Sequence, residues 1–391
     1  MKKILVLVAS ETNLPAIKAA KRLGYYVITC DNNEKNIGHR FADENIFIDV
    51  YDTERILEEV QNKEIDAVVT FVSAHGLKSA SIISQKLKLS GYSQKGLDIL
   101  LNKGLFRDYQ KQSGLKFPRY QLVNSLMQVD IVNLTYPSII KPADQGGSKG
   151  VAVIRNKAEL EEYFNRADNR SETDSFIIEE YLVSEDLING ECIIQNGRVL
   201  ASFIGDYIFD KKVTDVIPVA TLFPSQYKAQ KVLAQISTIV DDLKIPNGLI
   251  NFEVIIKGDE AYIVEINPRP SGNYLWKLMG HHFNCNIAEV IIKQSLGEYI
   301  DESVFILKEM KSHYAYQLFY SSKNQTFRQL DLPQNLQESI IDIKWFYSPG
   351  EDINVMKSLY DRVGIALLEI KDEEQYCNYF ENLDFFRIKN E

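Results

Sequence analysis

The first 95 residues alternate short apolar runs with amphipathic stretches. Residues 4–9 are continuously apolar, which is typical of a strand buried on both faces of a parallel sheet. Asn13 follows as a helix cap, with Pro15 near the start of the predicted helix and Gly24 at its end. The remaining elements are strands over 26–30, 45–50 and 65–71 and a helix over 53–61. This order predicts a doubly wound parallel sheet of the βαβ type.

A second pattern is a β-hairpin within residues 251–273. The strands FEVII and AYIVEI flank the turn 257–260. Glu265 and Asn267 share a face because strand side chains alternate. A three-residue loop would place Glu253 directly opposite Glu265, whereas a two- or four-residue loop would turn it to the other face.

The same hairpin is a candidate metal site. Two facing carboxylates, Glu253 and Glu265, repel each other unless a cation lies between them. Together with the amide oxygen of Asn267 they form an oxygen set of the kind that Mg²⁺ prefers, normally shared with substrate phosphates and water. Arg269 follows two residues later. The alternative is an exposed hairpin with an acidic rim.

Residues 136–154 predict a strand, a glycine-rich loop and a second strand. Lys141 ends the first strand, and Pro142 stops its continuation. The loop 144–150 contains Gly146, Gly147, Ser148, Lys149 and Gly150. Glycines allow backbone N–H groups to close on phosphate oxygens, while a serine and a lysine add further donors. This pattern predicts a flap over phosphates, and a flexible hairpin is the alternative.

Two further stretches carry weaker signals. Residues 176–178 lead into Glu179, Glu180, Tyr181 and Leu182, whose backbone could hydrogen-bond the edge of a purine, and Asp186 could bind ribose hydroxyls. The helical stretch 96–114 carries Lys103 and Arg107 four residues apart on one face. Most such pairs are solvated surface charges.

Composition narrows the class of protein. A chain of 391 residues can hold two to four domains, and its net charge of −10 argues against nucleic-acid and anionic-membrane partners. Its four cysteines form no CxxC pair, and neither a secretory signal nor a membrane span is present, so we expect a cytoplasmic protein with free thiols. The GxGxxG and Walker A motifs are absent, which disfavours a nicotinamide dehydrogenase or a P-loop enzyme.

In this order the motifs resemble those of the ATP-grasp superfamily over roughly residues 1–300. The matching stretches are LNKGLFRDYQKQSGLKFPRY, IIKPADQGGSKGVAVI, FIIEEYL followed by Asp186, and FEVIIKGDEAYIVEINPRPSG, of which the last is the most specific. The resemblance implies an α/β and α+β protein: a Rossmann-like domain over 1–95, an ATP-grasp domain of two α+β subdomains over 96–300, with a small lid at about 115–183, and a small C-terminal α+β unit over 301–391.

The resemblance also implies roles by position. Lys103 and Lys141 correspond to the nucleotide lysines. The flap would include Gly146, Gly147, Ser148 and Gly150; the adenine hinge would be Glu179, Glu180, Tyr181 and Leu182; Asp186, with Glu185 as the alternative, would bind the ribose; Glu253, Glu265 and Asn267 would be the Mg²⁺ ligands; and Arg269, with Lys141, would be catalytic.

The implied activity is ATP-dependent ligation. A substrate carboxylate would be activated as an acyl phosphate and condensed with an amine, with two Mg²⁺ ions for which Mn²⁺ can substitute. The stretches TLFPS and NPRPSGN favour amino-acid ligases. A formate- or bicarbonate-using enzyme of purine-type metabolism and a non-catalytic ATP-binding module remain alternatives. The partners would be small molecules, and a homodimer is the default oligomer.

Overall fold

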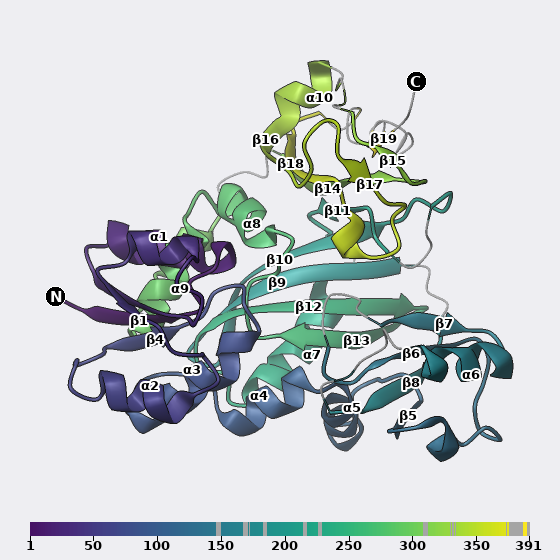
Figure 1. Ribbon diagram of the computed structural model, residues 1–391, viewed down its shortest axis with the longest axis horizontal. Helices are drawn as coiled ribbons and strands as arrows, with labels where there is room; N and C mark the ends of the chain where they lie inside the picture. The colour runs from purple at the N-terminus through teal and green to yellow at the C-terminus, as the bar shows by residue number, and fades with distance from the viewer. Residues whose placement is uncertain are drawn as a thin grey trace.

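The computed structural model describes residues 1–145, 150–166, 171, 173–182, 186–213, 217–225, 229–307, 312–328, 330, 332, 334–372, 374 and 386–388. It contains three principal sheets, which Figure 1 shows at the left, the centre with the top, and the lower right. Within the described residues, no helix is both long and apolar enough to cross a bilayer. Cys30, Cys192 and Cys285 are free thiols, and Cys377 lies outside the described residues.

The N-terminal sheet is parallel, as its apolar runs predict. Its strand order is β3-β2-β1-β4. The strands are β1 Lys3–Leu7, β2 Tyr26–Cys30, β3 Glu44–Ile46 and β4 Ala67–Val69. The connecting helices are α1 Leu14–Arg22, α2 Thr53–Val60 and α3 His75–Lys86.

A small antiparallel sheet forms the lid at the lower right of Figure 1, with the order β5-β8-β6-β7. Its elements are β5 Tyr120–Val123, β6 Ser138–Pro142, β7 Ala152–Ile154, β8 Phe176–Glu180 and the helix α6 Lys157–Asn165. The lid has its own apolar core, in which Ile140, Ile178 and Leu160 are fully buried. The small sheet and α6 therefore pack around a core that is separate from those of the other sheets.

The largest sheet runs through the middle of the molecule in the order β13-β12-β9-β10-β11-β14-β18-β16, with β19 pairing with β14. Its strands are β9 Asp186–Gln195, β10 Arg198–Ile208, β11 Ala220–Phe223, β12 Gly248–Lys257, β13 Glu260–Asn267, β14 His313–Ser321, β16 Ile340–Trp345, β18 Gly364–Ile370 and β19 Arg387–Ile388. Because β14 pairs with β11, the C-terminal strands extend the sheet that carries the predicted metal hairpin. The remaining C-terminal elements are β15 Gln325–Thr326, β17 Asp352–Ile353 and α10 Gln334–Ser339.

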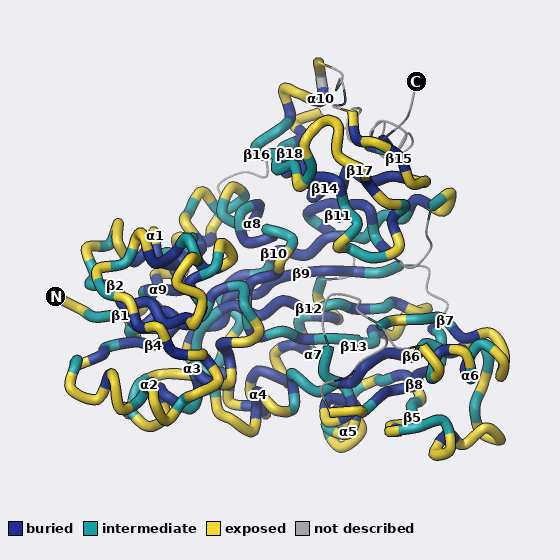
Figure 2. Tube along the Cα trace, in the orientation of Figure 1, coloured by how far each residue is buried: buried dark blue, intermediate teal, exposed yellow. Residues whose placement is uncertain are grey.

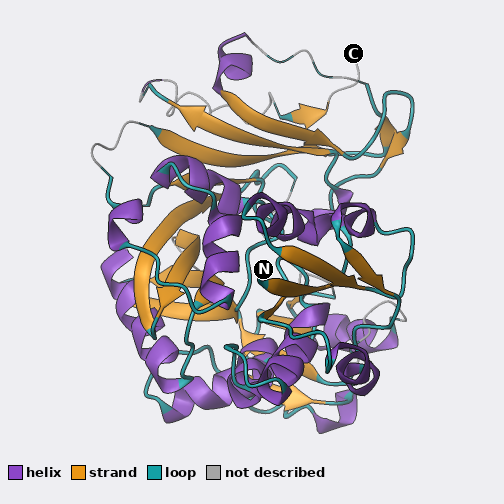
Figure 3. Ribbon diagram, turned by 90° about the vertical axis from the view of Figure 1, so that its left-hand side faces the viewer, coloured by secondary structure: helices purple, strands orange, loops and turns teal. Residues whose placement is uncertain are grey.

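Helices cover both faces of this sheet, and the strands between them are the buried layer in Figure 2. One face packs on α4 Gln94–Leu101, α5 Lys103–Gln112 and α7 Ala229–Asp242. The other packs on α8 Leu275–Phe283 and α9 Ile287–Ser295. In Figure 3 the C-terminal strands, which continue this sheet, lie at the top of the molecule.

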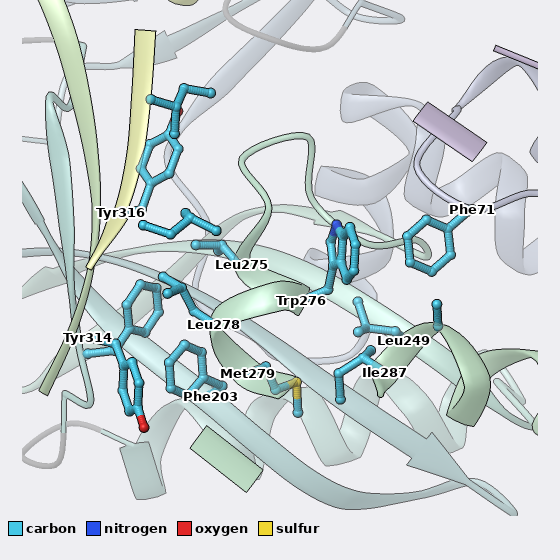
Figure 4. Packing of buried hydrophobic residues seen from close by; sticks show 14 of the residues in the cluster. Phe71, Phe203, Leu249, Leu275, Trp276, Leu278, Met279, Ile287, Tyr314 and Tyr316 are labelled. Atoms are coloured by element: carbon cyan, nitrogen blue, oxygen red, sulfur yellow. The ribbon is translucent and has the colours of Figure 1, made fainter. Parts of the chain in front are cut away.

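Helix α8 connects the N-terminal domain to the large sheet. The Trp276 ring packs edge-on against Phe71, with centroids 5.0 Å apart (Figure 4). Leu275 and Leu278 of the same helix point toward Tyr314 and Tyr316 of the C-terminal unit in that view. One continuous apolar cluster therefore joins the N-terminal domain, the large sheet and the C-terminal strands.

Candidate active site

A β-bulge decides the register of the predicted metal hairpin. Lys257 pairs with Glu260, so the turn has only two residues, and regular pairing would place Glu253 opposite Val264. The register shifts between Val254, which pairs with Ile263, and Glu253, which pairs with Glu265. Val264 is the extra residue on β13. Of the alternatives left open by the sequence, the turn has the two-residue form, and the bulge rather than a three-residue loop aligns the two carboxylates.

The two facing carboxylates create a site that favours a cation. Burial and the neighbouring Glu265 raise the pKa of Glu253 to about 7, although the Tyr207 hydroxyl donates a 2.9 Å hydrogen bond to its Oε1. Asn267 lies two cross-strand pairs further along, opposite Asn251. The described residues contain no cluster of three or more His, Cys, Asp or Glu side chains that could hold a metal. The hairpin therefore fits Mg²⁺ shared with phosphate oxygens better than a metal held by protein ligands alone.

Both predicted nucleotide lysines lie beside this hairpin. Lys103 opens α5; its Nζ donates to the carbonyl of Gln145 and lies 3.9 Å from Glu265 Oε1. Lys141 ends β6 and is almost completely buried. The positive charges of both lysines lower the pKa of Glu253, so lysines and carboxylates share one electrostatic site.

Glu179 of the predicted hinge faces inward. Its Oε2 lies 2.7 Å from Lys141 Nζ, and its Oε1 accepts from Arg107 Nε at 2.7 Å. Burial alone would raise the pKa of Glu179, but the two cations lower it to about 2. The expectation that Arg107 is a solvated surface charge is wrong, because its side chain is fully buried.

Glu180, the next residue, faces outward because side chains alternate along β8. Its carboxylate accepts from the Nε and backbone N–H of Arg119 at 3.0 and 3.1 Å. The N–H groups of Glu180 and Tyr181 donate to the carbonyls of Arg119 and Pro137. Their carbonyls and the N–H of the buried Leu182 are therefore the hinge groups best suited to a purine edge.

The other nucleotide positions are described only in part. Gly146, Gly147 and Ser148 of the flap, and Glu185, lie outside the described residues. Gly150 has φ +65° and hydrogen-bonds through its carbonyl to the Tyr163 hydroxyl at 2.5 Å. Asp186 is the first residue of β9, the strand that follows the hinge, and it pairs with Ile256 of β12.

Two groups, one beside Arg269 and one beside Glu253, were not found from the sequence. Glu191 on β9 is fully buried; its Oε1 accepts from the Ser271 N–H at 2.7 Å, and its Oε2 has no hydrogen-bond partner among the described residues. Burial raises the pKa of Glu191 to about 8, although Ser271 and Arg269 limit the rise. Tyr207 is the second group. The available signal was the polar Asn189 and Glu191 in the otherwise apolar strand LINGECIIQ.

Arg269 itself lies at a junction between the domains. It follows β13 and borders a cavity of about 90 Å³, together with residues of the N-terminal domain and of β12: Thr70, Leu77, Ser81, Gly248 and Leu249. Asn273, four residues on, accepts a 3.3 Å hydrogen bond from Tyr316 of β14. A substrate beyond the phosphates would therefore meet side chains from all three parts of the chain.

The arrangement as a whole is that of an ATP-grasp fold: a lid sheet and a large sheet whose lysines and carboxylates converge. Residues 100–273 match the family model described as "ATP-grasp domain". An ATP-grasp domain therefore occupies this part of the chain, and the resemblance expected from the motifs is confirmed.

Relatives and solved structures agree with this assignment. The chain is 26% identical over 305 residues to the carbamoyl phosphate synthase large chain of Thermotoga petrophila, covering 74% of this chain but only 27% of that protein. It is 25% identical over 390 residues to the formate-dependent phosphoribosylglycinamide formyltransferase of Wolinella succinogenes, covering 95% and 92%.

Two solved structures share the fold over almost their whole length. The L-amino acid ligase from Bacillus licheniformis superposes with a TM-score of 0.81 at 17% identity, covering 100% of this chain and 99% of that one. An ADP complex of an N5-carboxyaminoimidazole ribonucleotide synthetase superposes with a TM-score of 0.72 at 16% identity, covering 98% of this chain and 96% of that one. At these identities the structures establish the fold and leave the substrate open.

Proposed function

We propose that this protein is an ATP-dependent ligase that activates a carboxylate as an acyl phosphate and joins it to an amine. The observation that carries the proposal is the pair Glu253 and Glu265, brought face to face beside Lys103. Like charges held together in this way destabilise a hairpin unless a cation and a polyphosphate occupy the site. Nucleotide-binding relatives with the same fold support this reading.

In the first step, a substrate carboxylate oxygen attacks the γ-phosphorus of ATP, and the bond to the β–γ bridging oxygen breaks, releasing ADP. Lys103, Lys141 and Arg269 would neutralise the charge that builds on the phosphoryl oxygens. Glu253, Glu265 and Asn267 would hold Mg²⁺, which supplies further charge neutralisation. We expect two ions, for which Mn²⁺ can substitute.

In the second step, the amine nitrogen attacks the acyl carbon, the acyl–oxygen bond breaks, and inorganic phosphate leaves with that electron pair. The amine loses a proton, and an amide forms. This chemistry requires no nucleophile from the protein. It does require that water be excluded, because an acyl phosphate hydrolyses. The glycine-rich loop 144–150, part of which lies outside the described residues, is the sequence-based candidate for the flap that excludes water.

We propose an amino acid as the amine. The fold likeness to an L-amino acid ligase extends over the whole chain, including the C-terminal strands. A formate- or bicarbonate-using enzyme of purine-type metabolism is the second candidate, because the Wolinella formyltransferase matches 95% of the chain. A non-catalytic ATP-binding module is the third, although retention of Glu253, Glu265, Asn267 and Arg269 speaks against it.

The test is Mg²⁺-dependent ADP release, measured over amino acids and small carboxylates crossed with amines, with the products weighed by mass spectrometry. ADP release with a condensed product of the expected mass supports the proposal and identifies the substrates. Release with formate or bicarbonate and a phosphoribosyl amine favours the second candidate. Binding of MgATP without turnover over the whole matrix favours the third.

A further inference from the structure

Arg107 is the most completely engaged side chain near the site, and the mechanism above does not use it. It lies on α5 with no solvent exposure. Its Nε donates to Glu179 Oε1, and its Nη1 donates to Gln110 Oε1, each at 2.7 Å. Nη1 also reaches the carbonyl of Ile263 at 3.3 Å, and Nη2 reaches that of Val264 at 2.8 Å.

These two carbonyls flank the bulge that aligns the metal hairpin. Without the bulge, Val264 would pair with Glu253, and regular pairing from the two-residue turn would place Glu265 opposite Phe252, on the buried face. Gln110 adds a second donor to the Ile263 carbonyl at 2.9 Å. Side chains of α5 therefore bind the bulge at the point where Glu265 is turned toward Glu253.

The other end of the guanidinium binds the nucleotide side of the site. Glu179 receives Arg107 on one oxygen and Lys141 on the other. Glu179 lies on the lid strand β8, and Val264 lies on β13 of the large sheet. A single fully buried cation thus connects the lid to the metal hairpin.

We propose that Arg107 is a positioning residue with two roles, and this inference rests on the proposed function. It holds the bulge that brings Glu265 opposite Glu253, and it fixes Glu179, which contacts Lys141. The guanidinium carries its donors on three nitrogens spread over a plane, whereas the three donors of a lysine lie on one nitrogen, which cannot reach Glu179 and the carbonyls of Ile263 and Val264 together. Replacement by lysine preserves the charge beside Glu179 and gives up the bulge contacts. Replacement by methionine gives up both.

The two replacements separate the two roles. The affinity for ADP is measured calorimetrically in EDTA and in excess Mg²⁺ for the wild type, Arg107→Lys and Arg107→Met. In EDTA, the affinity of Arg107→Lys for ADP should lie within about threefold of that of the wild type. The factor by which Mg²⁺ increases the affinity for ADP should be at least about tenfold smaller in this variant than in the wild type. Arg107→Met should lose at least about tenfold in both conditions.

The control is Arg387→Met. Arg387 of β19 pairs with the buried Asp210, which follows β10, so the variant loses a comparable buried ion pair while the contacts of Arg107 remain. Its ADP and Mg²⁺ dependences should match those of the wild type. All binding is measured well below the unfolding temperature of each variant, which circular dichroism establishes.

The outcomes are distinct. If the wild type binds no MgADP, the proposed function fails, whatever the variants do. If the wild type binds and both folded Arg107 variants keep its affinity and its Mg²⁺ enhancement, the role of Arg107 is purely structural and the inference is wrong. If Arg107→Met does not fold, Arg107→Lys decides through its Mg²⁺ enhancement alone.

Discussion

Replacing Glu265 with glutamine should stabilise the ligand-free protein while removing its activity. Glu265 faces Glu253 directly across the hairpin, and burial together with the charge of Glu265 raises the pKa of Glu253 to about 7. The replacement keeps the shape of the side chain and removes one of the two repelling charges. A cation bound between the two carboxylates relieves their repulsion, and the replacement removes one of its ligands. The same change should therefore abolish the stabilisation by Mg²⁺ with nucleotide.

The structure sets the magnitude. The rise in the pKa of Glu253 from 4.5 to about 7 corresponds to about 3 kcal/mol. Burial is the largest cause and the charge of Glu265 is the second, so repulsion accounts for only part of this energy. The contact of Glu265 with Lys103, at 3.9 Å, offsets part of the gain. We expect Glu265→Gln to raise the free energy of unfolding by about 1 kcal/mol at pH 8 without ligand.

Urea unfolding at pH 8, in EDTA and then with MgADP, measures both effects. Ligand at one hundred times its dissociation constant should stabilise the wild type by about 2.7 kcal/mol and leave Glu265→Gln nearly unchanged. The matched control is Glu260→Gln on the same hairpin. Glu260 lies 3.4 Å from Lys116, so this variant should lose up to about 1 kcal/mol and keep its turnover.

One result would refute this reasoning. If Glu265→Gln is less stable than the wild type in EDTA and MgADP still stabilises it fully, then the carboxylates neither repel each other nor bind the metal. ADP release by the same variant, at the wild-type rate, would lead to the same conclusion. The metal site would then have to lie elsewhere in the clasp.

Three further predictions follow from the buried groups and the flap. In the folded protein the pKa of Glu191 is about 8, above the ordinary 4.5, so the wild type should lose up to about 1.4 kcal/mol of unfolding free energy per pH unit between about pH 5 and 8. Glu191→Gln should lack this loss in urea unfolding, and parallel stability curves for the two proteins would contradict the prediction. Lys141→Met should weaken ADP binding at least about tenfold, because Glu179 then keeps only its arginine partner and the phosphates lose a cation; unchanged calorimetric affinity would contradict it. Gly150→Ala should lower the free energy of unfolding by about 1–2 kcal/mol for its left-handed backbone, and by more because the Pro142 ring lies 3.0 Å from the new methyl group. Gly258→Ala, with φ +57° and open space around the methyl group, should show the backbone cost alone in the same unfolding assay.

The local patterns of the sequence were enough to predict the N-terminal parallel sheet and the hairpin with its acidic residues. Continuous apolar runs and capped helices are local signals, and the model confirms the parallel order of β1, β2 and β4. The residue types of the hairpin also carried the chemistry, because carboxylates spaced twelve residues apart around a turn have few other uses. The functional roles of these residues remain predictions, as do the domain limits near residues 95 and 300.

The sequence alone determined which side chains were available; the tertiary structure decided which of them meet. Arg107 was expected at the surface because helical spacing does not show what a helix packs against, whereas the fold brings β8 and β13 to the same guanidinium. The facing of Glu253 and Glu265 depends on a bulge that regular alternation cannot predict. Glu191 became visible only through its burial among distant segments. Burial and ladder register arise from contacts between residues far apart in the chain, and no local pattern encodes them.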